Sequence, residues 1–474
     1  MTLTNQVLVK SGLETDFSLL YVDAIKREKE ATAKKKGKTY VMSKKARLYY
    51  QNQGVEAFRC SIIREQESYS YHKLNIALAA NNVFQKFTNL SNLKCIKVPS
   101  RNKLHKYVNR LSCGNLRYLH TRFNEILFKN KVFLKGLEFD AGDLYLDSTC
   151  VGAQMRYPVD WILIRDGCRT MLKAMKLIRR SGVKCRMPNI DSFMTSMNGL
   201  CIKMAAAKRT NDAQRKSKAV LREMKILEKV IRRHSVNHYQ KFSSQWTRTL
   251  YTDGRAKVIL NRLGKTIDIM PKVIFQAHER IIGERQIKQS NKILSLYQDD
   301  VHMVKRRKSE AHNEFGNQLL IGEQANGFII DFHFEQEKVS NDSKILPGLI
   351  ERFESTFNQP PTSITTDRGF SSPANSKLLE SKNIYNAICP KSPAELTNKM
   401  TDETFRKKIK RRGPNEGRVG ILKNNFLSGS KKAYGFERRH KAIHWWVIIH
   451  NLTKLTNLLI EQEKELERQN KQVA

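Results

Sequence analysis

Strand-like and helix-like segments alternate over residues 318–389, and this alternation limits the possible folds more than any other feature of the sequence. Two strand-like runs, QLLIGE (318–323) and GFIIDFHF (327–334), flank Asn326-Gly327, a dipeptide typical of hairpin turns. After this hairpin the pattern predicts a helix at about 342–356, a strand at 363–366, a helix from about 373 and a strand at 383–389. Strands that alternate with helices predict a sheet covered by helices, which is an α/β core.

The first strand of this core stands far upstream of the others. Residues 138–154, EFDAGDLYLDSTCVGAQ, have strand character, with apolar residues alternating around Tyr145. A long helical stretch follows at 158–300. Residues 1 to about 135 and the segment from about 440 onward are also predicted to be helical. We therefore expect an α/β core that a large helical insertion interrupts after the first strand.

The charge of the chain points to a polyanionic partner. Its 474 residues include 86 Lys and Arg against 45 Asp and Glu, a formal net charge of +41. So many positive side chains repel one another unless a polyanion neutralises them. Nucleic acid is therefore the expected partner, and an anionic membrane surface is the alternative. Residues 169–265 hold 24 Lys and Arg against 5 Asp and Glu, and residues 398–441 hold 14 against 4. The first of these segments favours a surface that contacts phosphates over ordinary solvated helix faces.

Several other classes of protein are not expected. No run approaches about 18 apolar residues, so no transmembrane helix is predicted, and the N-terminus lacks the pattern of a secretory signal. The eight cysteines form no Cys-x-x-Cys pair, so neither a zinc ribbon nor a redox motif is predicted. We interpret them as reduced thiols of a cytosolic protein. Trp445 and Trp446 are interpreted as core residues rather than rings that stack on bases.

The stretch VPSRNKLHKYVNRLS in the N-terminal region predicts a short helix. Ser100 is a suitable N-cap, and Leu104, Val108 and Leu111 recur at the spacing of one helix face. Preceded by NNVFQKFTNLSNL, this helix would suit a helix-turn-helix unit that binds DNA. An ordinary amphipathic helix is the alternative.

Three acidic residues stand where catalytic carboxylates are expected. Asp147 ends the first core strand, Asp367 ends the strand at 363–366, and Glu416 follows Gly413-Pro414 at the start of an expected helix. Ligand sites in open α/β sheets favour the carboxyl ends of strands. Each residue also has an ordinary structural explanation. An Asp at a strand end often forms a turn or caps a helix, and Glu416 can interact favourably with the positive end of the helix dipole.

If the three carboxylates converge, they suit a pair of magnesium ions. Two strand-end aspartates and a helix glutamate could bind two Mg²⁺ about 4 Å apart. Two ions at that spacing stabilise the attacking and leaving oxygens when a phosphodiester is displaced.

Four blocks of the sequence, in order, resemble those of the DDE transposases of bacterial insertion sequences, which share an RNase H-like catalytic core. The blocks are YLDSTCVGAQMRYPVD (145–160), RRKSEAHNEFGNQLLIG (306–322), ITTDRGFSSPANSKLL (364–379) and RRGPNEGRVGILKNNF (411–426). The segment YGFERRHKAIHWWVIIHNLTKL (434–455) resembles the helix that closes the family's core.

The resemblance also assigns basic residues, with two departures. The family's Glu block is written Tyr-x2-Arg-x3-Glu-x6-Lys; Arg412, Glu416 and Lys423 fit it, and Ile409 stands at the Tyr position. This implies that Arg412 and Lys423 contact DNA phosphates near the metals, and Arg368 is a further candidate contact. Many relatives carry an inserted domain between the second Asp and the Glu, whereas this chain carries its insertion after the first strand.

The resemblance implies a transposase in which Asp147, Asp367 and Glu416 hold two Mg²⁺, with Mn²⁺ as a substitute. It would hydrolyse phosphodiesters at the element ends and transfer the freed 3′-hydroxyl into target DNA. The implied partners are double-stranded DNA, both terminal inverted repeats and target, and a second copy of the chain. The implied location is the bacterial cytoplasm, with the nucleoid. The alternatives are an RNase H-fold nuclease without strand transfer and a non-catalytic DNA-binding derivative.

Five segments are therefore predicted. They are a helical DNA-binding region at 1–135, the first part of an RNase H-like core at 136–160, a basic helical insertion at 161–300, the remainder of the catalytic core at 301–456, and the end of the C-terminal helix with a tail at 457–474.

Overall fold

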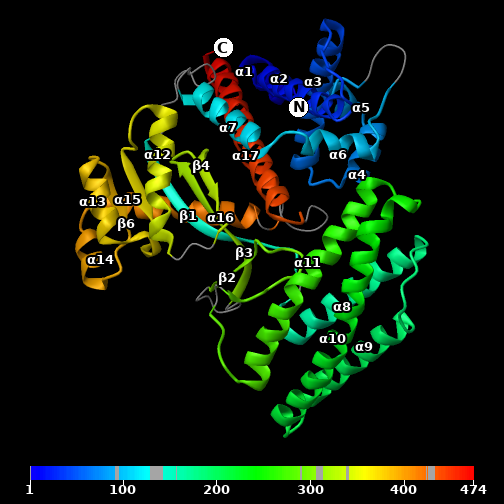
Figure 1. Cartoon of the computed structure of the whole chain (residues 1–474). Helices are drawn as coiled ribbons and strands as arrows, with labels where there is room; N and C mark the ends of the chain where they lie inside the picture. The colour runs from blue at the N-terminus through cyan, green and yellow to red at the C-terminus, as the bar shows by residue number, and fades with distance from the viewer. Residues whose placement is uncertain are drawn as a thin grey trace. The chain divides into compact units, whose positions relative to one another are not determined.

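The computed structural model of the chain describes residues 2–90, 96–128, 142–155, 157–288, 291–305, 313–337, 341–422, 424 and 433–473. The chain divides into two compact units. Residues Met1–Gln154 with Gly316–Ala474 form one, the core unit, and Met155–Phe315 form the other, the helical unit. Figure 1 shows their helices and strands, with labels where there is room.

A mixed sheet lies mainly in the core unit, and its strand residues 302–305 and 313–315 belong to the helical unit. Its strands are β1 (Asp143–Gly152), β2 (His302–Lys305), β3 (Asn313–Gln324), β4 (Ile329–Phe334), β5 (Ser363–Thr366) and β6 (Tyr385–Ile388). The order is β2-β3-β1-β5-β6, and β4 pairs with β3. The β1–β3 and β3–β4 pairs are antiparallel, whereas β1–β5 and β5–β6 are parallel. This mixed sheet with flanking helices confirms the predicted fold class, an RNase H-like core with a helical N-terminal region.

Helices cover both faces of the sheet. Leu144, Leu146 and Ile364 pack on one face against α12 (Leu346–Phe357) and α13 (Pro373–Ser381). On the other face, strand residues such as Val151 pack against α17 (Phe436–Val473). Trp446 of α17 belongs to that second cluster and is 1% exposed. Its neighbour Trp445 is 1% exposed as well, which confirms that both indoles are core residues.

The N-terminal region is helical, as predicted. Its helices are α1 (Thr2–Ser11), α2 (Leu13–Lys34), α3 (Lys44–Gln66), α4 (Tyr71–Ala80), α5 (Asn82–Phe87), α6 (Arg101–Asn109) and α7 (Cys113–Phe128). Ser100 caps α6 by accepting a hydrogen bond from the Lys103 N–H, and Leu104, Val108 and Leu111 are buried. These helices enclose a core that also contains residues of α17, so the last helix serves both parts of the core unit.

Side chains from α7 and α17 cover the outer backbone of β4. His120 Nε2 lies 2.8 Å from the Ile329 carbonyl oxygen, and Asn124 donates to the Ile330 carbonyl at 2.8 Å. Asn451 of α17 accepts from the Ile329 N–H and donates to its carbonyl, both at 2.9 Å. A bare strand edge would invite pairing with another chain, and these contacts satisfy its backbone groups.

Asp331 of β4 ties three elements together. It accepts from Arg117 of α7 at 2.8 Å and from the Nε and Nη2 of Arg352 of α12 at 2.9 and 2.7 Å. The side chain of Asp331 is only 7% exposed, whereas the arginines are 29% and 30% exposed. The buried charge is therefore fully paired, as burial requires.

The helical unit contains α8 (Asp160–Arg180), α9 (Ile190–Ala207), α10 (Ala213–Gln245) and α11 (Asp253–Ala277) around its own apolar core. The predicted helical character of the insertion is confirmed. Gly167 permits α8 to approach α11 closely, because a Cβ there would lie 2.1 Å from Met270 Sδ. The two ends of the unit meet, since the rings of Tyr157 and Phe315 contact edge to face with centroids 5.4 Å apart.

The expected elements of the C-terminal half appear close to their predicted bounds, and three elements were not anticipated. Asn326-Gly327 forms the β3–β4 turn with a left-handed Gly327, and β5 spans the predicted residues. The unanticipated elements are β2, α14 (Pro393–Lys399) and α15 (Glu403–Arg411). The sequence of α15 shows only a high positive charge and does not by itself predict a helix.

Replacing Asp331 with Asn should lower the free energy of unfolding by about 3 kcal/mol, because Arg117 and Arg352 would lose their shared counter-charge. Burial opposes ionisation of Asp331, but the two arginines outweigh it and lower its pKa. The stabilisation should therefore be present above the ordinary pKa of 3.8 and be lost as the pH falls through the lower folded value. Urea unfolding followed by circular dichroism, at pH 7 and through the acid range, measures both effects.

The matched control is Glu403→Gln. Glu403 pairs with Lys407 at 2.8 Å on the surface of α15, and its side chain is 69% exposed. Its loss should cost less than about 0.5 kcal/mol. An equal cost for both variants, or a cost at Asp331 that does not shrink in acid, would contradict the assignment.

Candidate active site

The parallel pairing of β1 with β5 places Asp147 and Asp367 beyond the same end of the paired segment. Residues 143–145 pair with residues 363–365, at a constant offset of 220. The same offset carries Asp147 to the level of Asp367, the residue that follows β5. Both strands run in the same direction, so both aspartates lie at the carboxyl side of the paired segment, where α/β sheets place their ligands.

The prediction that Asp147 ends the first core strand is wrong: β1 continues to Gly152, because residues 148–152 also pair with β3. Asp147 is half-buried in the middle of the strand. Side chains alternate along a strand, so Asp147 shares a face with Tyr145 and Val151. Val151 packs into the cluster that contains α17, which identifies this as the face under that helix. Oδ1 of Asp147 accepts a hydrogen bond from the Ser148 N–H at 2.9 Å.

Asp367 both ends β5 and begins a turn. Its Oδ1 accepts from the Gly369 N–H at 2.9 Å and caps the short 3₁₀ helix η5 (Arg368–Phe370). Phe370 is fully buried and anchors this turn, whereas Arg368 is exposed. Asp367 therefore does form a turn, which is the ordinary structural role that the sequence allowed for it. The turn holds the half-buried carboxylate at the strand end and leaves Arg368 in solvent beside it.

A third carboxylate, Asp342, lies next to Asp367 and was not predicted from the sequence. It begins η4 (Asp342–Lys344), just before α12. It accepts from the Ser148 hydroxyl at 2.7 Å and from the side-chain amide of Gln318. A Cβ on Gly369 would lie 3.0 Å from Asp367 Oδ1 and 3.3 Å from Asp342 Oδ2. The glycine therefore leaves a space that two carboxylates border.

Glu416 belongs to α16 (Gly413–Ile421), which has Pro414 in its first turn, as predicted, and packs on β1. The Glu416 side chain lies outside the described residues. The helix is anchored by Arg418, whose Nε and Nη2 donate to the two carboxylate oxygens of Glu323 on β3. Glu323 is 1% exposed; burial raises its pKa, and Arg418 and then Arg411 oppose that shift.

Two of the predicted phosphate contacts, Arg412 and Lys423, come from the segment of α15 and α16, whereas Arg368 belongs to η5. Arg412 is half-buried between the two helices, and its N–H donates to the Lys408 and Ile409 carbonyls, each at 3.2 Å. Lys423 lies outside the described residues. Buried Phe405 anchors α15, and this helix exposes three further basic side chains, those of Arg406, Lys407 and Lys410. We call these three residues the α15 basic face.

Lys408 joins α15 to the start of β1. Its Nζ donates to Asp143 Oδ1 at 2.7 Å and to the Ser363 hydroxyl at 2.9 Å. Burial opposes ionisation of Asp143, but the hydrogen bonds from Lys408 and Ser363 outweigh it and lower the pKa of Asp143. This acid is therefore a structural partner of a lysine, four residues before Asp147 on the same face.

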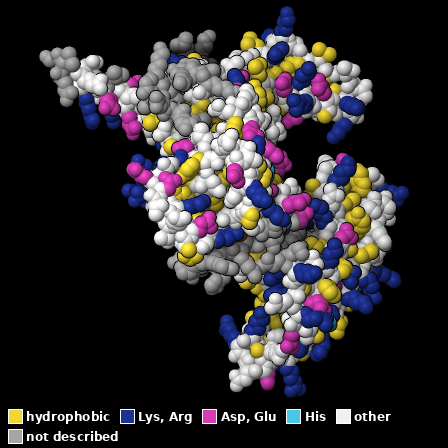
Figure 2. All heavy atoms as spheres, turned by 90° about the vertical axis from the view of Figure 1, so that its left-hand side faces the viewer, with side chains coloured by type: hydrophobic (Ala, Val, Ile, Leu, Met, Phe, Trp, Pro, Cys, Tyr) yellow, Lys and Arg dark blue, Asp and Glu magenta, His cyan; other side chains and the backbone are white. Residues whose placement is uncertain are grey.

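Basic side chains are also abundant outside the site. Most Lys and Arg residues at 169–265 in the helical unit are exposed. Figure 2 shows Lys and Arg side chains spread across one face of the molecule, with Asp and Glu side chains among them. This distribution suits repeated contacts with a long polyanion better than a single small anion.

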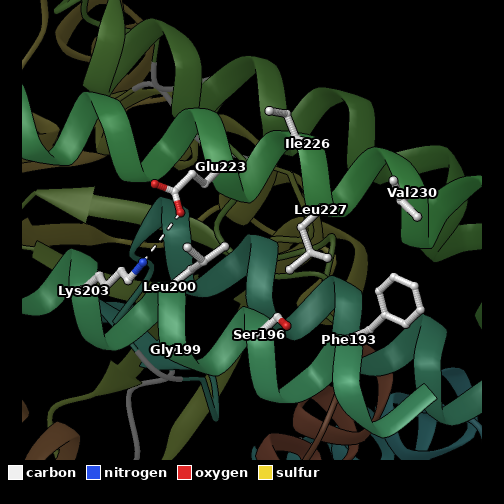
Figure 3. A pocket seen from close by; sticks show the side chains of 9 residues that line it. All are labelled: Phe193, Ser196, Gly199, Leu200, Lys203, Glu223, Ile226, Leu227 and Val230. Atoms are coloured by element: carbon white, nitrogen blue, oxygen red, sulfur yellow. Dashed lines mark ion pairs between the residues drawn. The ribbon is translucent and has the colours of Figure 1, made fainter. Parts of the chain in front are cut away.

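A groove on the helical unit has a different character. It lies between α9 and α10, has a volume of about 560 Å³ and is lined by apolar side chains that include Phe193, Leu200 and Leu227 (Figure 3). Lys203 and Glu223 form an ion pair across it at 3.8 Å. None of the predicted catalytic carboxylates lines this groove.

Comparison with known proteins identifies the C-terminal part of the chain. Residues 300–452 match the family model of the Transposase DDE domain. The match includes Asp342, Asp367 and Glu416 and begins after Asp147 and most of the helical unit. No curated protein and no solved structure matches the chain. Within the described ranges, no helix has the length and apolar character needed to span a membrane.

The family match confirms the resemblance to DDE transposases for the three blocks within residues 306–426, whereas the first block, 145–160, lies outside the matched residues. The sheet has the mixed topology expected of that core. Residues 300–452 of the chain therefore form a Transposase DDE domain.

Proposed function

We propose that this transposase cleaves phosphodiester bonds at the ends of a DNA element and transfers the freed 3′-hydroxyl into target DNA, with Asp147, Asp367 and Glu416 as its catalytic residues. The observation that carries the proposal is the parallel register of β1 and β5, whose offset, extended past the paired residues, would bring Asp147 level with Asp367. We include Glu416 in the catalytic set because it lies in the first turns of α16, just after Pro414, and α16 packs on β1.

The residues at this end of the strand pair fit divalent metal ions. The donors are carboxylate oxygens, which Mg²⁺ and Mn²⁺ prefer, and Gly369 leaves open the space between Asp367 and Asp342. Two Mg²⁺ ions held there, with Mn²⁺ as a substitute, would supply charge stabilisation to the attacking and leaving oxygens. The chain itself contributes fixed positions: η5 holds Asp367, and the Arg418–Glu323 pair anchors the helix of Glu416.

DNA binding would draw on charge from several elements. Arg368 is exposed beside Asp367, and the α15 basic face belongs to the helix that precedes α16. Arg412 and Lys423 remain proposed phosphate contacts from the family's Glu block. The N-terminal helices would read the terminal inverted repeats, and two copies of the chain would pair the two element ends.

Asp367→Asn and Asp147→Asn should each lower the rate of end cleavage by at least about 1,000-fold, the scale on which loss of one charge-stabilising group acts. Binding to end DNA should change little, because the carboxylates hold metal and not phosphate. Cleavage of labelled end DNA in Mg²⁺ and a gel-shift titration measure the two effects. Glu380→Gln, an exposed acid on α13, is the matched control and should cleave normally.

Wild-type cleavage by either Asn variant would overturn the assignment. A pre-cut end that carries a free 3′-hydroxyl tests the second step. If the wild-type chain cleaves ends but never joins the pre-cut end to target DNA, it is a nuclease with this fold and not a strand-transferring enzyme.

Asp342→Asn should raise the Mg²⁺ concentration for half-maximal cleavage about tenfold, since it removes one negative charge beside the proposed metals. The side-chain oxygen of Asn can still accept the hydrogen bond from the Ser148 hydroxyl, so the turn at η4 should persist. The rate at saturating Mg²⁺ should stay within a few-fold of wild type. Glu351→Gln, an exposed acid on α12, should leave the metal dependence unchanged. An unaltered metal dependence in Asp342→Asn would remove Asp342 from the site.

Replacing the α15 basic face, Arg406, Lys407 and Lys410, with Ala should weaken DNA binding and make it less sensitive to salt. Each lost phosphate contact should reduce the slope of log K against log salt by about 0.9. Lys377→Ala is the single-residue control, because Lys377 is exposed on α13, which covers the opposite face of the sheet. A salt slope equal to that of wild type would exclude this face from the DNA interface.

A further inference from the structure

Three potential metal ligands meet where α7 begins and α17 passes. Cys113 is the first residue of α7, and His440 and His444 stand four residues apart on α17. One ligand atom from each of the three lies within 4.8 Å of the others. Two histidines at this spacing project from the same side of a helix, which is how helices present imidazoles to a metal.

The imidazoles have buried nitrogen atoms without hydrogen-bond partners among the described residues, namely His440 Nε2 and His444 Nδ1. His444 is 1% exposed. A buried polar atom without a partner costs free energy and calls for an explanation, such as an ion. The Cys113 thiol donates only a weak hydrogen bond to the Glu437 carbonyl oxygen, which lies 3.9 Å from its Sγ.

The surroundings hold the two imidazoles in place and keep them neutral. Phe332 contacts His444 edge to face with centroids 4.7 Å apart, and Phe334 and Phe436 flank His440. Burial lowers the pKa of His440 to about 4 and that of His444 well below its ordinary value. Neutral imidazoles at pH 7 offer lone pairs to a cation.

The positive side chains near these three residues repel a bound cation only weakly, because each is paired with an acid. Arg117 faces both imidazoles, but Asp331 pairs with its guanidinium at 2.8 Å. Lys441 faces the thiol and is paired with Glu437 at 3.1 Å. Burial raises the pKa of Cys113, and Lys441 partly offsets that effect, so the thiol keeps its proton until a metal displaces it.

We propose that Cys113, His440 and His444 form a binding site for a borderline-soft divalent cation of the Zn²⁺ class, separate from the carboxylate site. One thiolate and two imidazoles suit Zn²⁺ and not Mg²⁺, which prefers oxygen. On binding, the thiol proton leaves to solvent, two nitrogen lone pairs and the thiolate bind the ion, and water completes a tetrahedral shell. The ion would join the N-terminal helices to the last helix of the catalytic core. This inference is independent of the proposed function.

The test uses the full-length chain, stripped with a chelator and kept reduced, in excess Mg²⁺ that competes with the probe for any site made of carboxylate oxygens. Co²⁺ serves as the spectroscopic probe and Zn²⁺ as its competitor. The wild-type chain should bind one equivalent of Co²⁺ with a thiolate-to-cobalt absorption band, which Zn²⁺ abolishes. Cys113→Ser should lack the band and bind Zn²⁺ at least about 100-fold more weakly, more than loss of a supporting partner usually costs.

Two further measurements guard against misfolding and against another thiol. Cys389→Ser removes a half-buried cysteine elsewhere in the core unit and should keep the band and the affinity. Zn²⁺ should raise the Tm of the wild type and of Cys389→Ser but not that of Cys113→Ser, whose metal-free Tm should match the wild type. No saturable Co²⁺ band in the wild type, or an equal band in Cys113→Ser, would overturn the proposal.

Discussion

The geometry of the candidate active site depends on the register of one parallel strand pair, β1 with β5. Leu144, Leu146 and Ile364 point into the apolar layer under α12 and α13, and this packing determines the register. A slip of one residue would turn every side chain of a strand to the opposite face. The positions of Asp147 and Asp367 therefore follow from aliphatic packing on the far side of the sheet, and not from any contact between the acids.

The acids of the core unit divide into two groups by their surroundings. Asp331 and Glu323 are almost fully buried, and each is paired with two arginines, so they stabilise elements and have no room for a ligand. Asp367 is half-buried at a strand end, beside a glycine and an exposed arginine. Buried charges need permanent partners, whereas an acid that binds a metal must be reachable. This contrast separates structural acids from candidate ligands better than sequence position does.

The sequence was most informative where local rules dominate. Period-two runs and Asn326-Gly327 predicted β3, β4 and β5, and Ser100 predicted the start of α6. Asp342 escaped prediction because it resembles an ordinary residue before a helix, and only tertiary packing brings it beside Gly369. The α15 helix escaped because its charge concealed the single buried anchor, Phe405. His440 and His444 show helical spacing, but their cysteine lies more than 300 residues earlier, beyond any local motif.

The meeting of Tyr157 with Phe315 has a consequence for how the chain folds. Because the ends of the helical unit touch, the folded insertion acts on the sheet as a short connection, and β1 and β3 can pair much as the arms of a hairpin do. Closing a long unfolded loop carries an entropy cost, which prior folding of the insertion would largely remove.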